Sequence, residues 1–261
     1  MNYRKLIAIF SSIVLISSCI SQPTKQPSIS TSPSMTDVTT RVLFIGNSYT
    51  FFNDLPEMFA ELSRSGGYEV EVDMSAQGGW SLADHASSAI TLNKIEQQEW
   101  NYIILQERTS LIVDNPDDYM YPAIRILCEK IRAQDATPIL FMTWGPRDGL
   151  PSTGCKNFDD TLARIYSNCM DIAHELDLMV APVGIAWQKG IERDPQVNLW
   201  NSDGSHPSRE GSYLAACVFY VIIFNQNPEG LTYRAGLTEE RAYFLQNIAV
   251  ETVLDGCILL R

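Results

Sequence analysis

The chain has few of the residues that build metal centres. Only three histidines and six cysteines occur among its 261 residues, and no two cysteines form a Cys-x-x-C pair. A structural zinc site needs four such ligands, usually in closely spaced pairs. The sequence therefore predicts no metal site, and nothing in it calls for a cofactor.

Basic residues are also scarce. Nineteen Lys and Arg face 31 Asp and Glu, which makes the formal net charge −12. No Lys/Arg cluster is present that could neutralise nucleic-acid phosphates, so we expect no nucleic-acid partner. The sequence contains neither GxGxxG nor GxxxxGK[ST], so a nucleotide-binding protein, the weakest alternative, has little support.

The N-terminus has a short apolar run. Residues 6–16 follow Arg4 and Lys5 and fall well short of the roughly 20 apolar residues that cross a bilayer, so they predict a secretory signal peptide. The tetrad 16–19 (Ile-Ser-Ser-Cys) resembles a bacterial lipobox. That resemblance implies cleavage before Cys19, lipidation of its thiol, and an exported protein held in the cell envelope by a lipid anchor on the membrane. An ordinary signal peptide with an incidental cysteine is the alternative.

Three segments follow from this pattern. Residues 1–18 are the expected signal peptide, and residues 19–40 combine the lipidated cysteine with a linker rich in Ser, Thr, Pro and Gln. Such a composition cannot bury enough apolar surface to fold. Residues 41–261 are long and apolar enough for one globular domain.

Within this domain, short β-rich runs alternate with longer helix-like ones, which indicates an α/β fold with a parallel sheet. Strands are expected at residues 41–46, 68–75, 102–106, 138–143 and 178–181. Helices are expected after an Asp54/Glu57 capping box, then at residues 81–98, 122–133, 158–176, 210–224 and 238–254. The leading architecture is a flavodoxin-like three-layer α/β/α sandwich with about five parallel strands, whose ligands sit at the carboxyl ends of the strands.

Four polar segments follow predicted strands or lie in the late loop: residues 46–50 (GNSYT), 78–81 (GGWS), 106–107 (QE) and 203–207 (DGSHP). Together they hold the parts of a serine hydrolase, namely a nucleophile, a base, a group that orients the base, and oxyanion donors. Asp203 and His206 are three residues apart, so one turn brings the carboxylate to Nδ1 and leaves Nε2 to accept the Ser48 proton.

These segments resemble blocks of the SGNH (GDSL-like) hydrolase superfamily. Its first block matches Gly46-Asn47-Ser48, and its last block, Asp-x-x-His-Pro, matches residues 203–207. The resemblance implies a serine esterase with Ser48, His206 and Asp203 as triad, and with the N–H groups of Ser48 and Gly79 as oxyanion donors. Gly78 is the less favoured choice for the second block.

The third block departs from the family pattern. The family places an Asn amide there as a third oxyanion donor, whereas this chain has Gln106 followed by Glu107. We expect Gln106 to take that role, or alternatively to satisfy buried backbone groups. Because one such donor contributes about 10²–10³ in rate, an inactive domain that binds glycan or protein is the alternative function.

Three tryptophans, Trp80, Trp144 and Trp200, lie near predicted strand ends or the catalytic turn. Aromatic rings at a cleft can stack on sugars, so they are candidates for binding a carbohydrate ester, with core packing as the alternative. No apolar lid for a fatty acyl chain is evident, which favours a deacetylase acting on small-molecule or carbohydrate esters over a lipase. His85 and His174 are expected to be structural.

Overall fold

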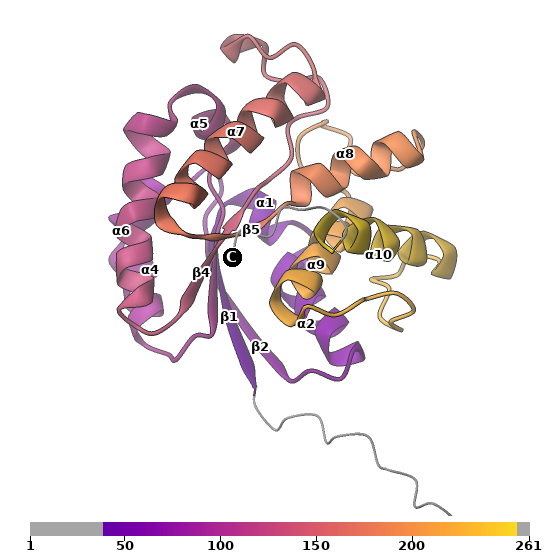
Figure 1. Cartoon of the computed structure of the whole chain (residues 1–261), viewed down its shortest axis with the longest axis horizontal. Coiled ribbons are helices and arrows are strands. Elements are labelled where there is room, and N and C mark those ends of the chain that lie inside the picture. Colours follow the sequence, from indigo (N-terminus) through magenta and orange to yellow (C-terminus); the bar gives the residue numbers. More distant parts are fainter. Residues whose placement is uncertain (1–38, 255–261) are drawn as a thin grey trace, which may run out of the picture. The chain divides into compact units, whose positions relative to one another are not determined.

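The computed structural model describes residues 39–254 and contains a five-stranded sheet whose strands are all parallel (Figure 1). The strands are β1 (Thr40–Gly46), β2 (Val70–Ala76), β3 (Tyr102–Leu105), β4 (Thr137–Phe141) and β5 (Met179–Ala181). Their order in the sheet is β2-β1-β3-β4-β5. The predicted flavodoxin-like fold is confirmed, and each strand lies within a few residues of its expected position.

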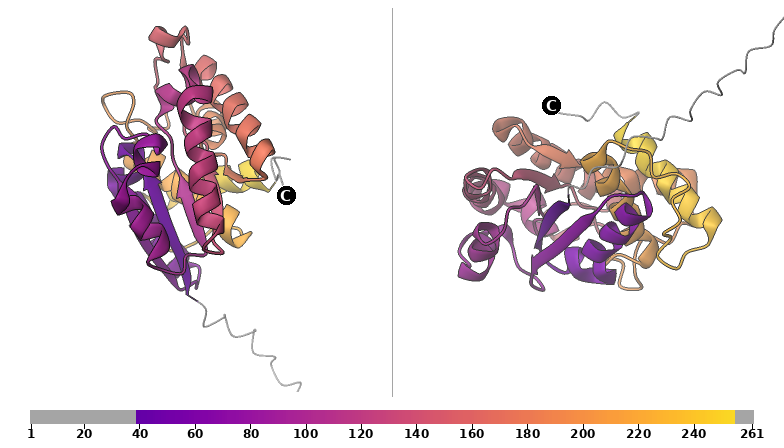
Figure 2. Two further views of the ribbon diagram at one scale, coloured as in Figure 1. Left: turned by 90° about the vertical axis from the view of Figure 1, so that its left-hand side faces the viewer. Right: turned by 90° about the horizontal axis from the view of Figure 1, so that it is seen from below.

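Helices cover both faces of the sheet, as the view from below in Figure 2 shows. They are α1 (Ser48–Phe51), α2 (Leu55–Ser65), α3 (Leu82–Ala86), α4 (Ala89–Glu96), α5 (Thr109–Asp114), α6 (Tyr121–Arg132), α7 (Phe158–Leu176), α8 (Val183–Arg193), α9 (Arg209–Phe224) and α10 (Glu239–Val253). Single helical turns, η1 (Phe52–Asp54), η2 (Pro116–Met120) and η3 (Pro151–Thr153), lie in the connections.

Alternating side chains of each strand divide the core in two. Val42 and Phe44 of β1 join a cluster with α2, α8, α9 and α10, whereas Leu43 and Ile45 join a second cluster with α3, α5, α6 and α7. This follows from the two-residue period of a strand that is covered on both faces. The two layers of helices therefore hold β1 in place from both sides.

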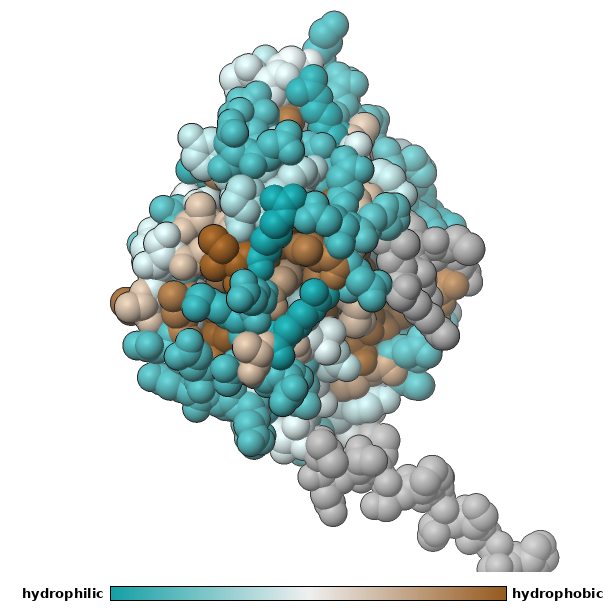
Figure 3. Space-filling model, turned by 60° about the vertical axis from the view of Figure 1, so that its left-hand side comes forward, coloured by the Kyte–Doolittle hydropathy of each residue, from teal (hydrophilic) through white to brown (hydrophobic). Residues whose placement is uncertain are grey.

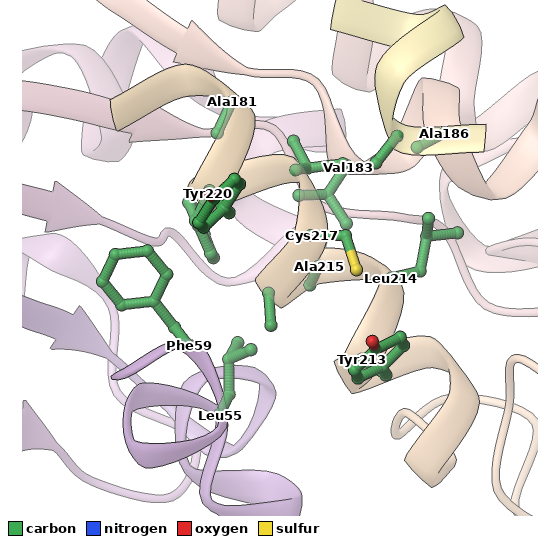
Figure 4. Packing of buried hydrophobic residues seen from close by; sticks show 14 of the residues in the cluster. Leu55, Phe59, Ala181, Val183, Ala186, Tyr213, Leu214, Ala215, Cys217 and Tyr220 are labelled. Atoms are coloured by element: carbon green, nitrogen blue, oxygen red, sulfur yellow. The ribbon is translucent and has the colours of Figure 1, made fainter. Parts of the chain in front are cut away.

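Helix α9 is apolar around almost its whole circumference because it contacts helices on two sides. It packs against both α2 and α10, and its residues from Gly211 to Ile223 are buried. Figure 4 shows Leu55 and Phe59 of α2 facing this helix. A helix that is hydrophobic all round belongs inside a protein. Its N-terminus follows directly on residues 203–207, so the packing of α9 anchors one end of the loop that these residues form.

Some local expectations are wrong. Asp54 has a left-handed backbone and caps no helix with its side chain, so no Asp54/Glu57 capping box forms. The helix expected over residues 81–98 breaks into α3 and α4, because Ser88 begins a new helix by accepting the Thr91 N–H. Helices α5 and α8 lie in segments where no helix was expected. In each case the helix is short or follows a strand end, where tertiary packing outweighs local propensity.

The described surface is largely polar. On the face shown in Figure 3, hydrophilic residues dominate and hydrophobic ones gather near the middle. The large hydrophobic side chains exposed within residues 39–254 are Met74, Ile90, Tyr119, Ile126, Tyr166, Tyr243 and Leu254. None of the helices in this range has the length and apolarity needed to span a bilayer.

Candidate active site

The site lies where the sheet order reverses. Strands β1 and β3 are neighbours, and the chain leaves β1 toward β2 on one side and later returns to β3 on the other. In open parallel sheets this arrangement opens a crevice at the carboxyl ends of the two central strands. Ser48 begins α1 just beyond the end of β1, and Gln106, Glu107 and Arg108 follow β3.

The structure brings Ser48, His206 and Asp203 into one hydrogen-bonded chain. The Nδ1 atom of His206 lies 2.6 Å from Oδ2 of Asp203, and Nε2 lies 2.9 Å from Oγ of Ser48. An ionised carboxylate only accepts hydrogen bonds, so Nδ1 carries the proton and Nε2 accepts from the Ser48 hydroxyl. This is the arrangement a serine nucleophile and its base require.

The hydrogen bonds around Asp203 favour the ionised form of its carboxyl group. Its Oδ1 atom accepts the backbone N–H groups of Ser205 and His206, each at 2.9 Å. The bond from the Ser205 N–H contributes most to lowering the pKa of this carboxyl, and the His206 ring lowers the pKa further. Gly204, at φ +71°, supplies the left-handed turn that folds the carboxylate back onto these donors. The negative charge can therefore stabilise an imidazolium at His206.

The imidazole is also held between two aromatic rings. Phe52 stacks on the His206 ring, with centroids 4.2 Å apart and planes 14° from parallel, and Tyr49 meets it edge-on at 5.8 Å. Both rings come from the segment directly after Ser48. The segment that follows Ser48 thus positions the His206 ring through aromatic contacts that the sequence pattern did not reveal.

The loop of residues 203–207 is tied to the core by two further groups. The hydroxyls of Tyr49 and Ser205 lie 2.7 Å apart, and the Trp144 indole N–H donates to the Ser205 carbonyl at 3.0 Å. Tyr49 stacks on Trp144 with centroids 4.7 Å apart. Because Asp203 and His206 are partly exposed, these contacts rather than burial keep the loop in position.

Asn53 forms a second connection between the nucleophile segment and this loop. Its Nδ2 amide lies 3.1 Å from the Pro207 carbonyl, 3.0 Å from the Ser208 carbonyl and 2.9 Å from the Ser212 hydroxyl. Asn53 has φ +56°, a conformation that Asn adopts more readily than most residues. The only sequence signal for this residue was its polar side chain just before Asp54, which was too weak to identify it.

Two residues that line the pocket, Ser48 and Gly79, have unpaired backbone N–H groups within the described chain. Neither the Ser48 N–H nor the Gly79 N–H has a hydrogen-bond partner among the residues of the described part of the chain. Gly79 has φ +75°, and both residues line the pocket, whereas Gly78 does not. Asn47 joins the two segments, since its Nδ2 donates to the Trp80 carbonyl at 2.9 Å. The arrangement suits the binding of an oxyanion.

Gln106 does not occupy the predicted position of an oxyanion donor. It is 1% exposed and does not line the pocket. Its Oε1 atom accepts from the Asn47 N–H at 2.8 Å and the Thr50 hydroxyl at 2.9 Å, and its Nε2 donates to the Glu107 carbonyl at 2.7 Å. A Cβ at Gly46 would lie 2.4 Å from this Oε1. Gln106 therefore satisfies buried groups beneath the nucleophile, which is the alternative role considered for it.

Glu107, which does not line the pocket, connects the segments that begin at Leu82 and at Arg108. Its carboxyl group is fully buried and accepts the N–H of Leu82 at 3.1 Å and that of Arg108 at 2.6 Å. Burial raises its pKa to about 7. The segment that carries Gly79 runs directly into α3, which begins at Leu82, so Glu107 connects the start of that helix to the end of β3.

The pocket itself is small, with a volume of about 260 Å³. It is lined by 11 residues, among them Ser48, Gly79, Arg108 and His206. Within residues 39–254, no group of three or more His, Cys, Asp or Glu side chains is arranged to hold a metal ion.

The predicted sugar-binding role is wrong for two of the three tryptophans. Trp144 is fully buried, stacked between Tyr49 and Trp187, and Trp200 is 7% exposed and donates to the Gly145 carbonyl. Both are packing residues beneath the site. Trp80 is half-buried and lines a neighbouring hollow rather than the pocket that holds Ser48.

The other two histidines lie outside the pocket. His85 is buried, with Nε2 2.8 Å from the Gly46 carbonyl and Nδ1 2.9 Å from the Thr91 hydroxyl. Since a carbonyl only accepts, Nε2 carries the proton, and His85 supports the end of β1 as a neutral ring. His174 lies exposed on α7.

No family model matches the sequence, and no curated protein is similar to it. Several solved structures have a fold similar to that of this chain. A protein from Slackia heliotrinireducens classed as an SGNH hydrolase is 29% identical, with a TM-score of 0.62 over 71% of this chain and 100% of its own. A DUF4886 family protein from Bacteroides uniformis is 21% identical, with a TM-score of 0.68 over 83% and 95%. Axe2, an acetylxylan esterase from Geobacillus stearothermophilus, is 16% identical, with a TM-score of 0.56 over 70% and 94%.

Proposed function

The chain is a member of the SGNH hydrolase superfamily, and from this we propose that it is a serine esterase whose nucleophile is Ser48. The observation that carries the proposal is the unbroken chain of hydrogen bonds from the Ser48 hydroxyl through His206 to Asp203. The free N–H groups of Ser48 and Gly79 beside it supply the second requirement, which is a place for the oxyanion.

The geometry supports a two-step reaction. In the first step, Ser48 Oγ attacks the ester carbonyl while its proton passes to Nε2 of His206, and the N–H groups of Ser48 and Gly79 bind the oxyanion. The imidazolium then protonates the departing alcohol, leaving an acyl group on Ser48. In the second step, water attacks the acyl carbonyl while His206 takes a proton from it. The imidazolium then returns this proton to Ser48 Oγ as the bond between Oγ and the acyl carbon breaks, which releases the acid and restores the serine. Asp203 stabilises the imidazolium in both steps.

The substrate we propose is an ester with a short acyl group, carried by a small molecule or a carbohydrate. A pocket of about 260 Å³ next to Ser48 suits an acetyl group better than a fatty acyl chain. One structurally similar protein, Axe2, is an acetylxylan esterase, which supports a sugar alcohol on the leaving side. Of the three tryptophans, only Trp80 remains accessible enough to contact such a sugar.

Replacing Ser48 with alanine tests this proposal. We expect the turnover of p-nitrophenyl acetate to fall by about 10⁴-fold or more, since loss of the nucleophile disables the whole triad. Ser87→Ala is the matched control, because Ser87 is an exposed serine at the end of α3, away from the pocket. Circular dichroism should show that both variants are folded. Unchanged turnover in the Ser48 variant would remove this residue as the nucleophile.

A non-catalytic domain that binds glycan or protein is the second candidate. It is favoured by one observation, namely that the Gln106 amide does not serve as a third oxyanion donor. A fluorophosphonate probe decides between the two, because it labels only an activated serine. Labelling of the wild type at Ser48 supports the esterase, and absence of labelling with an intact fold supports the binding domain.

We also propose that the protein is exported and lipid-anchored through Cys19, with residues 19–40 as a tether. This expectation rests on the sequence, since residues 1–38 lie outside the described part of the chain. Expressed in a bacterial host, the full-length chain should partition with membranes and incorporate labelled palmitate. Cys19→Ala should abolish both, and membrane partitioning without label would indicate another form of attachment.

A further inference from the structure

The charge of the pocket differs from that of the chain around it. The chain carries 31 acidic and 19 basic residues, yet none of the 11 pocket-lining residues is acidic. Arg108 is the one permanently charged side chain among them, and it lies on the same pocket wall as the end of β3. A neutral acetyl ester needs no such cation, so this charge requires an explanation.

The Arg108 guanidinium retains most of its hydrogen-bonding capacity. Its Nη1 makes one long bond, 3.3 Å, to the Gly79 carbonyl, which leaves most of the five N–H donors of an arginine available. Within residues 39–254, no carboxylate pairs with it. Carboxylates pair with six of the other ten arginines in this range, namely Arg41, Arg64, Arg125, Arg193, Arg234 and Arg241.

The charge of Arg108 acts on the pKa of two acids, and both form their hydrogen bonds with other groups. Asp84 accepts the N–H and the hydroxyl of Ser81, and Glu107 is buried and accepts backbone N–H groups. The charge of Arg108 contributes to lowering the pKa of Asp84 without forming an ion pair with it. The neighbouring residue, Thr109, also lines the pocket, but its hydroxyl oxygen is buried and is not open to a ligand there. Neither acid therefore neutralises the charge of Arg108 at this wall.

From these contacts, and resting on the esterase function proposed above, we propose that the pocket binds an ester bearing a carboxylate or phosphate close to the scissile bond, and that Arg108 binds that anion. A planar guanidinium with free donors matches the two oxygens of either group. The specificity of the enzyme is then for acidic esters, such as acylated acidic sugars, rather than for neutral ones.

The test compares matched esters that differ only in charge. Wild-type kcat/KM is measured for para-acetoxybenzoate, for its neutral methyl ester, and for para-acetoxyphenyl phosphate. We expect the anionic esters to be preferred by about 10- to 100-fold, the usual contribution of hydrogen bonds to charged groups. The carboxylate and phosphate arms distinguish the two anions. The preference should shrink as salt is raised, because Arg108 is exposed.

Arg108→Gln should abolish this preference by lowering kcat/KM for the anionic esters much more than for the neutral ester, whereas Arg108→Lys should retain part of it. Arg147→Gln is the matched control: Arg147 is exposed on the loop after β4 and lies over the Trp200 ring, and its side chain is outside the pocket. It should keep the wild-type preference. An equal loss on neutral and anionic esters in Arg108→Gln would overturn the proposal, since Arg108 would then support Gly79 or the oxyanion instead.

Failure of the esterase function can be told apart from failure of this inference. Binding of the product anion, para-hydroxybenzoate, is measured by calorimetry on the wild type and on Arg108→Gln. Weaker binding to the variant supports the anion site even if no ester is hydrolysed. Equal binding, together with equal turnover of charged and neutral esters by an active wild type, overturns the inference and leaves the esterase intact.

Discussion

Replacing Gln106 with methionine separates the two roles that this residue can have. Methionine has a similar volume but no amide, so the Asn47 N–H and the Thr50 hydroxyl would lose their shared acceptor, and the Glu107 carbonyl would lose its donor. A buried polar group left unsatisfied costs about 1–3 kcal/mol. Because the Thr50 hydroxyl can rotate toward another acceptor, two groups are left unsatisfied, and we expect the free energy of unfolding to fall by about 2–6 kcal/mol in total.

Urea denaturation followed by circular dichroism measures this loss as a lower transition midpoint with an unchanged slope. The matched control is Gln98→Met, an exposed glutamine that should change stability by less than about 0.5 kcal/mol. Turnover of p-nitrophenyl acetate is measured on the same samples. An unchanged midpoint combined with a fall of about 10²–10³ in kcat would refute the structural role and reinstate Gln106 as an oxyanion donor.

Two further predictions concern the neighbouring residues. The buried carboxyl of Glu107 has a pKa raised to about 7, so it binds its proton more tightly in the folded than in the unfolded chain. Its contribution to stability should therefore fall by about 3 kcal/mol as pH rises from about 4.5 to 7. The difference in unfolding free energy between wild type and Glu107→Gln, measured across this pH range, should show this fall, and a rise would contradict the prediction. Trp144→Ala should lower the free energy of unfolding by about 3–5 kcal/mol, because a large ring is removed from between Tyr49 and Trp187. Urea denaturation measures this loss. A higher KM with an unchanged free energy of unfolding would show instead that Trp144 contacts substrate.

Much of the fold was predictable because its signals are local. The apolar runs of the strands and the polar segments between them specify an α/β sheet whatever surrounds them. The relation of Asp203 to His206 is also local, since three residues of chain and a glycine turn bring the carboxylate to the ring. The same holds for Ser48, which its position after β1 places at the edge of the sheet where ligands bind.

The direction of a polar side chain at a strand end was not predictable in this way. Gln106 turns beneath the nucleophile because Asn47, 59 residues away, presents an N–H that nothing else satisfies. Trp144 and Trp200 look accessible in the sequence, yet they are buried once Trp187 of α8 packs against both. That helix was itself expected to be a loop.

Local patterns in the chain thus decided the sheet, the identity of the candidate nucleophile, and the pairing of its base with a carboxylate. Only the tertiary structure decided which side chains line the pocket. Arg108 lines it and makes a single hydrogen bond, to the Gly79 carbonyl, whereas Gln106 does not line it. The physical reason is that a side chain turns toward the unsatisfied donors, acceptors and open volume around it, and those belong to segments far away along the chain.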